Sequence, residues 1–188
     1  MKGEVFRRGA TTEDGELKEP VQFDQLTSHI QALRRYAYGL CRDRHETEDL
    51  VQECLSRAIA AADTWRPDVS LRPWLFRILH NVYIGQLRRA QVRGPVHDPD
   101  EADGAVEGNH LASLELREVL AALDKLPAEQ RDAVLLVAVE DLPYREAADV
   151  LGIPLGTFMS RLGRGRKALR QLMGEERPPY LRIVGRDQ

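Results

Sequence analysis

The side chains best suited to chemistry in this chain are arginines and hydroxyls in a segment that lacks acids. Between Leu151 and Gly174 the charged residues are four arginines and one lysine, with no Asp or Glu. An arginine can donate two parallel hydrogen bonds to guanine, and hydroxyls can bond to bases or phosphates. The pattern therefore favours non-covalent recognition of DNA over the making or breaking of bonds.

Two helices joined by a tight turn, within Leu142–Arg170, are expected to position these side chains. Gly152 can take the left-handed conformation that the turn requires, and Pro154 suits the first turn of the second helix. The inner face of that helix is predicted from apolar residues at four- and seven-residue steps, which are Phe158, Leu162 and Leu169. The candidate DNA-reading residues on its outer faces are Thr157, Ser160, Arg161, Arg164 and Lys167. The segment thus predicts a helix-turn-helix.

The alternative for this segment is an ordinary helical hairpin with a solvated cationic face. Gly163 and Gly165 also argue for caution, because each costs up to ~1 kcal/mol relative to Ala inside a helix. The second helix is therefore expected to fray unless DNA or packing holds it.

A second basic stretch, Val69–His97, holds five arginines and no acid. Cations there can neutralise phosphates, aromatic rings can stack on unpaired bases, and an amide can bond to an extruded base edge. The candidate residues for opened DNA are Arg72, Trp74, Arg77, Asn81, Arg88 and Arg89. Two alternatives stay open, because the apolar residues could form only a core stripe and the arginines only a solvated face. Periodicity does not separate these interpretations.

An acidic stretch, ETEDLVQE at 46–53, predicts a helix with Glu46, Asp49 and Glu53 on one face. Such a face would bind a basic protein surface and repel DNA. The alternative is a solvated helix face stabilised by neighbouring arginines.

Length and composition limit the classes of function. The chain has 188 residues and a formal net charge of −3, with no apolar run near the ~20 residues of a membrane span and no apolar signal core at its start. We expect a cytoplasmic protein without membrane association. Cys41 and Cys54 flank His45 without a metal-binding spacing, so packed, reduced thiols are expected and a metal site is a weak alternative. With no nucleophile–base pair, phosphate loop or ligand cluster, the sequence predicts no enzyme activity, cofactor, metal or small-molecule substrate.

The periodicity predicts an all-α fold, since apolar residues recur at helical steps and no useful strand pattern occurs. We expect two small helical domains joined by a flexible acidic linker, with the helix-turn-helix in the C-terminal domain. The predicted segments are an N-terminal arm at 1–20, a first domain at 21–95, the linker at 96–110, a second domain at 111–174 and a tail at 175–188.

Three ordered motifs together resemble the extracytoplasmic-function (ECF) sigma factors, the minimal bacterial transcription initiation subunits. They are ETEDLVQE at 46–53, LRPWLFRILHNVYIGQLRR at 71–89, and the segment 123–172 that contains the helix-turn-helix. The resemblance spans about 21–173. It implies a non-enzymatic factor whose partners are core RNA polymerase and promoter DNA.

The resemblance also implies roles for individual residues. Polymerase binding would fall to Asp49, Leu50, Gln52 and Glu53. The melted −10 element would contact Trp74 and Asn81, with Arg77, Arg88 and Arg89 along the strand. The −35 element would be read by Ser160, Arg161, Arg164 and Lys167. The acidic linker would pass through the polymerase's basic channel.

The sequence departs from the family pattern at a few positions. Gly85 stands where an acid is common, Met159 where a Lys or Arg is common, and Gly163 and Gly165 in a usually HRAR-like segment. The segments LRRYAYGLC and LRPWLFRILHN resemble those of the alphaproteobacterial general-stress branch of this family. That resemblance implies a small helical anti-sigma factor as a further partner.

Two other functions compete with this interpretation. One is an ordinary helix-turn-helix regulator, which would bind duplex promoter without polymerase, usually as a dimer on spaced half-sites. The other is a helical adaptor that binds only proteins and shows no salt-sensitive DNA binding.

Overall fold

The computed structural model describes residues 23–66, 70–93 and 110–174. The helices are α1 (Phe23–Ser28), α2 (Ile30–Cys41), α3 (Arg44–Ala60), the short 3₁₀ helix η1 (Ala62–Thr64), α4 (Leu71–Arg93), α5 (His110–Asp124), α6 (Ala128–Ala138), α7 (Tyr144–Leu151) and α8 (Leu155–Met173). The arm expected at 1–20, the tail at 175–188 and all of the expected linker except His110 lie outside these residues.

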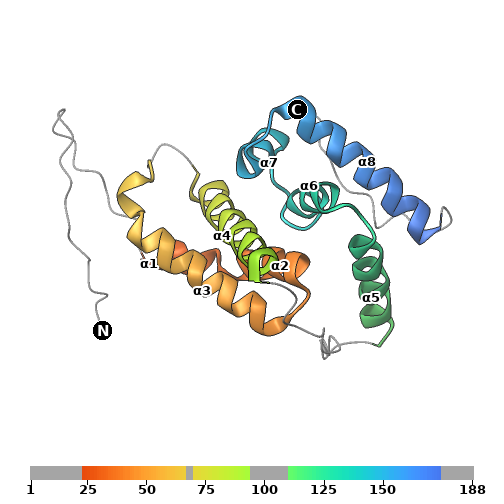
Figure 1. Ribbon diagram of the computed structural model, residues 1–188, viewed down its shortest axis with the longest axis horizontal. Coiled ribbons are helices and arrows are strands. Elements are labelled where there is room, and N and C mark those ends of the chain that lie inside the picture. Colours follow the sequence, from red (N-terminus) through yellow and green to blue (C-terminus); the bar gives the residue numbers. More distant parts are fainter. Residues whose placement is uncertain (1–22, 67–69, 94–109, 175–188) are drawn as a thin grey trace.

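The described residues form two groups of helices and contain no strand. Helices α1–α4 make the N-terminal domain and α5–α8 the C-terminal domain (Figure 1). The predicted all-α fold with two helical domains is confirmed. The boundaries expected at 21–95 and 111–174 stay predictions, because residues at their ends lie outside the described part.

The N-terminal domain is built where α3 packs against α2 and α4. Helix α2 ends at a single left-handed residue, Arg42, with φ 63°. Asp43 then caps α3 by accepting a hydrogen bond from the backbone N–H of Glu46 at 2.7 Å. The turn therefore lays α3 back across α2 and directs one face of α3 to the core.

The centre of this core is aromatic. The rings of Tyr36 and Phe76 meet edge to face with centroids 5.3 Å apart, and both side chains are fully buried. Tyr36 Oη and His80 Nδ1 lie 3.2 Å apart in a buried hydrogen bond. Burial lowers the pKa of His80 to about 4, so this imidazole is neutral at physiological pH and serves packing.

The C-terminal domain contains the predicted helix-turn-helix as α7 and α8. Gly152 ends α7 with φ 64°, and its N–H bonds to the carbonyl of Asp149 while the N–H of Ile153 bonds to Ala148. Pro154 precedes the first residue of α8. The predicted inner face is confirmed, since its residues are buried: Phe158, Leu162 and Leu169.

The two glycines of α8 have different environments. A Cβ on Gly165 would lie 2.8 Å from Val134 Cγ2 and 3.1 Å from the carbonyl oxygen of Gln130, so Gly165 permits the close crossing of α6 and α8. A Cβ on Gly163 would meet nothing within 4 Å. Helix α8 runs unbroken through both positions, because packing against α6 holds it.

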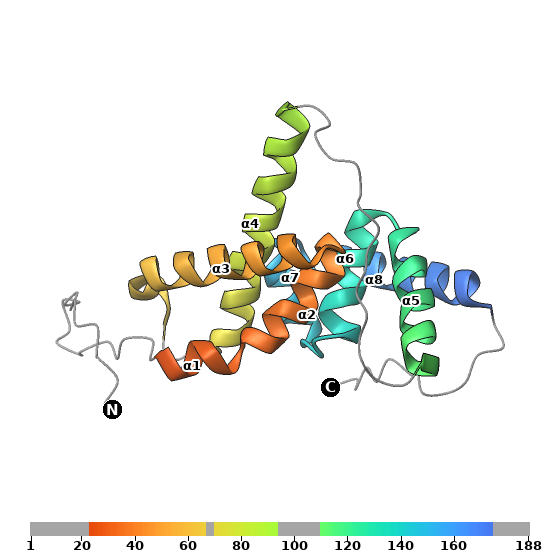
Figure 2. The same cartoon turned by 90° about the horizontal axis from the view of Figure 1, so that it is seen from below.

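The two domains also pack against each other. Helix α4 contacts α7, and α2 contacts α6, as the ribbon shows (Figure 1). Seen from below, the C-terminal half of α4 projects away from the other helices (Figure 2). The start of α4 therefore lies at the domain junction, whereas its end is free of it.

Substituting Gly165 with Ala should destabilise the fold by about 1–3 kcal/mol, because the added methyl group overlaps Val134 and the Gln130 backbone. The matched variant is Gly163→Ala, which should stabilise by up to ~1 kcal/mol through helix propensity alone. Urea unfolding followed by circular dichroism measures both. Equal stabilities for the two variants would show that the crossing does not require Gly165.

A second stability prediction concerns Asp132 on α6, which is 6% exposed and has no hydrogen bond to Oδ1. Burial raises the pKa of this carboxyl from 3.8 to about 6. A raised folded-state pKa gives stability that is complete below the unfolded pKa and is lost as the pH rises through about 6. The stability of Asp132→Asn relative to the parent should therefore grow by roughly 2–3 kcal/mol between about pH 4 and pH 8. Thermal melts across this range test it, and a constant difference would contradict it.

Candidate functional site

The outer face of α8 presents four of the five predicted reading residues to solvent. The exposed residues are Thr157, Ser160, Arg164 and Lys167. Arg164 Nε donates a 3.3 Å hydrogen bond to the carbonyl of Ser160, which leaves the far side of its guanidinium open. No side chain caps the first turn of α8, so its backbone N–H groups are available to a phosphate. This face can bind a duplex by charge and by hydrogen bonds.

Arg161 differs from the other four because it is only partly exposed, and its role in reading DNA stays a prediction. Its Nη2 lies 3.0 Å from Glu129 Oε2, and its side chain is 21% exposed. The physical reason is its position three residues after buried Phe158, which turns it toward α6. Arg161 ties α8 to α6 instead of projecting from the domain.

Sequence reasoning missed one residue that stabilises this domain. Arg166 donates to Tyr144 Oη at 3.1 Å and lies over the Tyr144 ring, 5.7 Å from its centroid. It therefore links the two helices of the motif. A cation–aromatic pair separated by 22 residues has no periodic signal in the sequence.

Helix α4 presents a line of exposed polar side chains. Arg77, Asn81 and Arg88 are exposed and follow one another at four- and seven-residue steps, so they share one face. Arg88 belongs to the C-terminal half of α4, which spans Leu71–Arg93. Trp74 is half-buried and packs on the core, which favours the core-stripe alternative for much of its ring.

Arg72 is not available on this face. Its Nη2 lies 3.0 Å from Glu140 Oε2 and also donates to the Glu140 backbone carbonyl. The residue is held at the domain junction, so its predicted contact with DNA conflicts with this arrangement.

The acidic face of α3 lines a shallow open groove of about 590 Å³. The residues around it are Asp49, Gln52, Glu53, Ser56, Gln86 and Arg89. Three of the four predicted polymerase-binding residues are thus brought together. Sequence reasoning missed Ser56 and Gln86, and it placed Arg89 with the DNA strand, because the packing of α4 on α3 cannot be read from either helix alone.

Leu50 is the fourth predicted polymerase-binding residue, and it is fully buried in the core. It follows Asp49 directly, so the helical turn points it inward when Asp49 points outward. A direct contact between Leu50 and a partner is incompatible with this structure. Leu50 anchors the helix that carries the acidic face.

Within 23–66, 70–93 and 110–174, no three His, Cys, Asp or Glu side chains are grouped so as to hold a metal ion. Among the helices in the described part of the chain, none has the length and apolar character to cross a membrane.

The two thiols are both shifted toward their protonated form. Burial raises the pKa of Cys54 to about 12, and burial with Glu46 and Asp43 nearby raises the pKa of Cys41 to about 12. Both thiols are therefore protonated at neutral pH.

Comparison with known proteins identifies both domains. The family model "Sigma-70, region 4" matches residues 116–169, and "Sigma2 domain of PhyR" matches residues 26–80. The chain is 35% identical over 156 residues to the ECF RNA polymerase sigma factor EcfG of Rhodopseudomonas palustris (strain TIE-1), with 80% of this chain and 83% of that protein covered. It is 31% identical over 161 residues to ECF RNA polymerase sigma factor SigW of Bacillus subtilis (strain 168), covering 79% and 86%.

A solved structure shows the same arrangement of helices. The sigma factor RpoE of Bartonella quintana, in complex with the anti-sigma factor NepR, superimposes with a TM-score of 0.71 at 31% identity, covering 82% of this chain and 97% of that chain. Both curated relatives are more than 30% identical to this chain over most of their length. The chain belongs to the ECF RNA polymerase sigma factors.

Proposed function

We propose that this sigma factor docks on core RNA polymerase through the α3–α4 groove and contacts promoter DNA through α4 and α8. The observation that carries the proposal is the separation of three exposed sets of side chains, one acidic and two cationic, on different helices. The experiment that tests it is transcription in vitro from a promoter library, with purified protein added to core polymerase. RNA with defined start sites is expected.

The face of α8 suits the −35 element. Arg164 and Lys167 are exposed cations, and Thr157 and Ser160 add hydroxyls near the start of the helix. A helix inserted in the major groove reads bases with its N-terminal residues and binds phosphates along its length. Arg161 is less available than these residues, because it is paired with Glu129 on α6 and is only partly exposed.

The face of α4 suits the opened −10 element. Asn81 lies between Arg77 and Arg88, so one side chain can hydrogen-bond a base edge while the cations on either side bind phosphates. Extruding a base costs a few kcal/mol, which contacts from both domains would offset. The protein needs no catalytic group for this, because polymerase carries out the chemistry.

The groove suits a polymerase helix with basic side chains. Asp49 and Glu53 supply negative charge on the α3 side, while Arg89 and Gln86 lie across the groove on α4. A partner that matches this arrangement presents cations toward α3 and an acid or carbonyl toward Arg89.

The proposal includes regulation by an anti-sigma factor in a stress response. Its support is the similarity to EcfG and to RpoE, whose structure was solved with the anti-sigma factor NepR. The protein would act in the cytoplasm, where its polymerase and promoter partners are found. An ordinary helix-turn-helix regulator or a protein-only adaptor has no use for all three faces.

Arg164→Ala should weaken binding to the −35 element by about 1–3 kcal/mol, because it removes a base-reading or phosphate-binding guanidinium. Polymerase binding should not change, since Arg164 is remote from the groove. The comparison variant is Arg161→Ala, which removes the ion pair with Glu129. It should lower the melting temperature, and it should weaken −35 binding less than Arg164→Ala does. Promoter footprints and thermal melts measure both. Footprints of Arg164→Ala identical to those of the parent would contradict its assignment.

Asp49→Lys should weaken capture of core polymerase by about tenfold, which corresponds to about 1.4 kcal/mol. The reason is the reversed charge at the edge of the acidic groove. Asp149→Lys is the matched control, because Asp149 is an exposed acid on α7 outside the groove. Pull-down titrations compare the two variants. Equal capture by both would exclude the groove as the polymerase-binding site.

A further inference from the structure

A carboxylate is buried at the junction of the two domains. Glu140 lies between α6 and α7, and its side chain has no exposed area. Burying a carboxylate is costly unless it is paired and hydrogen-bonded. The groups that pair with Glu140 therefore decide whether this arrangement of the domains is stable.

Both partners of Glu140 come from the N-terminal domain. Arg35 of α2 donates two hydrogen bonds, Nε to Oε1 and Nη2 to Oε2, each at 3.2 Å. Arg72 of α4 donates to Oε2 at 3.0 Å and to the backbone carbonyl. We call these three residues the Glu140 clasp. One carboxylate of the C-terminal domain thus connects two helices of the other domain.

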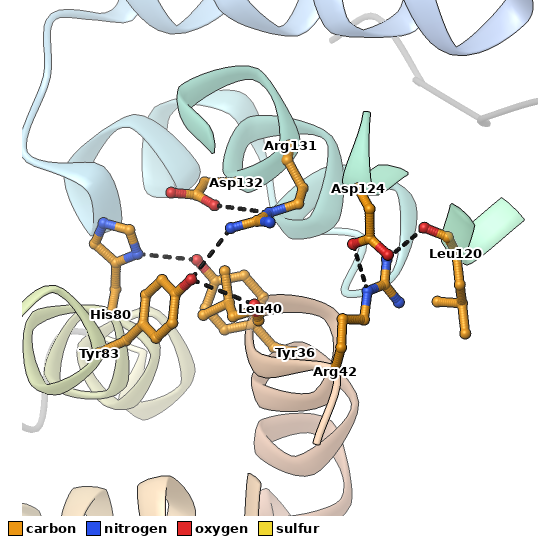
Figure 3. A network of polar contacts seen from close by, with 9 residues as sticks. All are labelled: Tyr36, Leu40, Arg42, His80, Tyr83, Leu120, Asp124, Arg131 and Asp132. Carbon is orange, nitrogen blue, oxygen red and sulfur yellow. Dashed lines mark hydrogen bonds and ion pairs between the residues drawn. The ribbon is translucent and has the colours of Figure 1, made fainter. Parts of the chain in front are cut away.

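Further polar contacts cross the same junction (Figure 3). Arg131 of α6 donates to Tyr83 Oη at 3.2 Å, and Arg42 pairs with Asp124 of α5 at 2.9 Å. Arg42 also donates to the backbone carbonyl of Leu120. Charged side chains from both domains, together with a tyrosine hydroxyl, therefore make up much of this side of the junction.

The backbone of α2 approaches α6 closely. A Cβ on Gly39 would lie 2.8 Å from Leu135 Cδ2, and the three nearest atoms all belong to Leu135. Gly39 therefore makes room for the C-terminal domain and not for a neighbour in its own domain.

This closed arrangement conflicts with simultaneous binding of both promoter elements. The −10 and −35 elements lie about 25 base pairs apart, or on the order of 80 Å at about 3.4 Å per base pair. Helix α7, which directly precedes α8, packs on α4, and α8 itself is only ~28 Å long. The two DNA-binding faces must separate before they can reach both elements.

The clasp also competes directly with DNA. Arg72 belongs to the basic stretch proposed to bind the opened strand, yet its Nη2 group is bonded to Glu140. Arg72 Nη2 donates to both the carboxylate and the backbone carbonyl of Glu140, so a phosphate that needs these donors must displace Glu140.

We propose that the Glu140 clasp holds the free protein in a self-restrained state, in which Glu140 occupies the place of a DNA phosphate on Arg72. The inference rests on the proposed function of α4 and α8. Removing one partner of a buried ion pair destabilises the closed arrangement, whereas both charges are solvated once the domains separate. The clasp therefore gives a junction that is specific when closed and separable when polymerase and promoter bind.

The test compares Glu140→Gln with the parent, as full-length chains. Small-angle X-ray scattering measures the radius of gyration. Fluorescence anisotropy measures binding of a short labelled single-stranded DNA of mixed sequence. If about one molecule in ten of the parent is open, full opening should tighten DNA binding about tenfold, and the radius of gyration should rise. Glu48→Gln is the control, because Glu48 pairs with Arg34 inside the N-terminal domain and should change neither measurement.

Gly39→Leu provides a second variant that leaves all the charges in place. Its side chain should push Leu135 away and open the junction, with the same two changes. An unchanged radius of gyration in both variants would overturn the closed state whatever α4 binds. Opening without tighter DNA binding would overturn the claim that closure withholds Arg72. The proposed function is tested separately, by the polymerase pull-downs of Asp49→Lys and the promoter footprints of Arg164→Ala.

Discussion

The close crossing of α6 and α8 at Gly165 is the constraint on which the DNA-binding face depends. Without a side chain at Gly165, Val134 and the Gln130 backbone lie directly against α8, and the apolar face of α8 is buried. A helix fixed in rotation presents a fixed set of outer residues. The cationic face of α8 is therefore defined by contacts on the opposite side of the helix.

The same rule governs the N-terminal domain. Leu50 is buried in the core, and its anchoring turns Asp49 and Gln52 toward solvent beside α4. The groove then exists because α3 and α4 pack side by side, each adding polar residues to its edges. Both proposed binding surfaces thus follow from the way in which apolar side chains fix helix orientation.

Much of the fold could be predicted from periodicity and turn residues. The helix-turn-helix, its left-handed Gly152 and its buried Phe158 follow from local sequence rules. Leu50 and Arg161 are less exposed than the sequence predicts, and both differences concern the rotation of a helix about its axis. Leu50 is one residue from exposed Asp49, and Arg161 is three residues from buried Phe158, so it shares the inward side of the helix; the sequence alone does not fix the phase of each face closely enough.

The contacts of Arg72 and Glu140 could not be predicted, for a different reason. These residues are 68 positions apart, and no periodic pattern links them. Their pairing depends on how two domains meet, which is a property of the whole chain. Sequence reasoning assigned Arg72 correctly to a basic segment but could not see which anion it binds in the free protein.

The state of the two thiols has a consequence for how an oxidative signal could reach this protein. With pKa values of about 12, the fraction of thiolate at neutral pH is on the order of 10⁻⁵. Peroxide attacks the thiolate and not the thiol, so Cys41 and Cys54 react slowly with it. These are the two cysteines of the chain. Neither thiol is therefore suited to act as a direct sensor of peroxide at neutral pH.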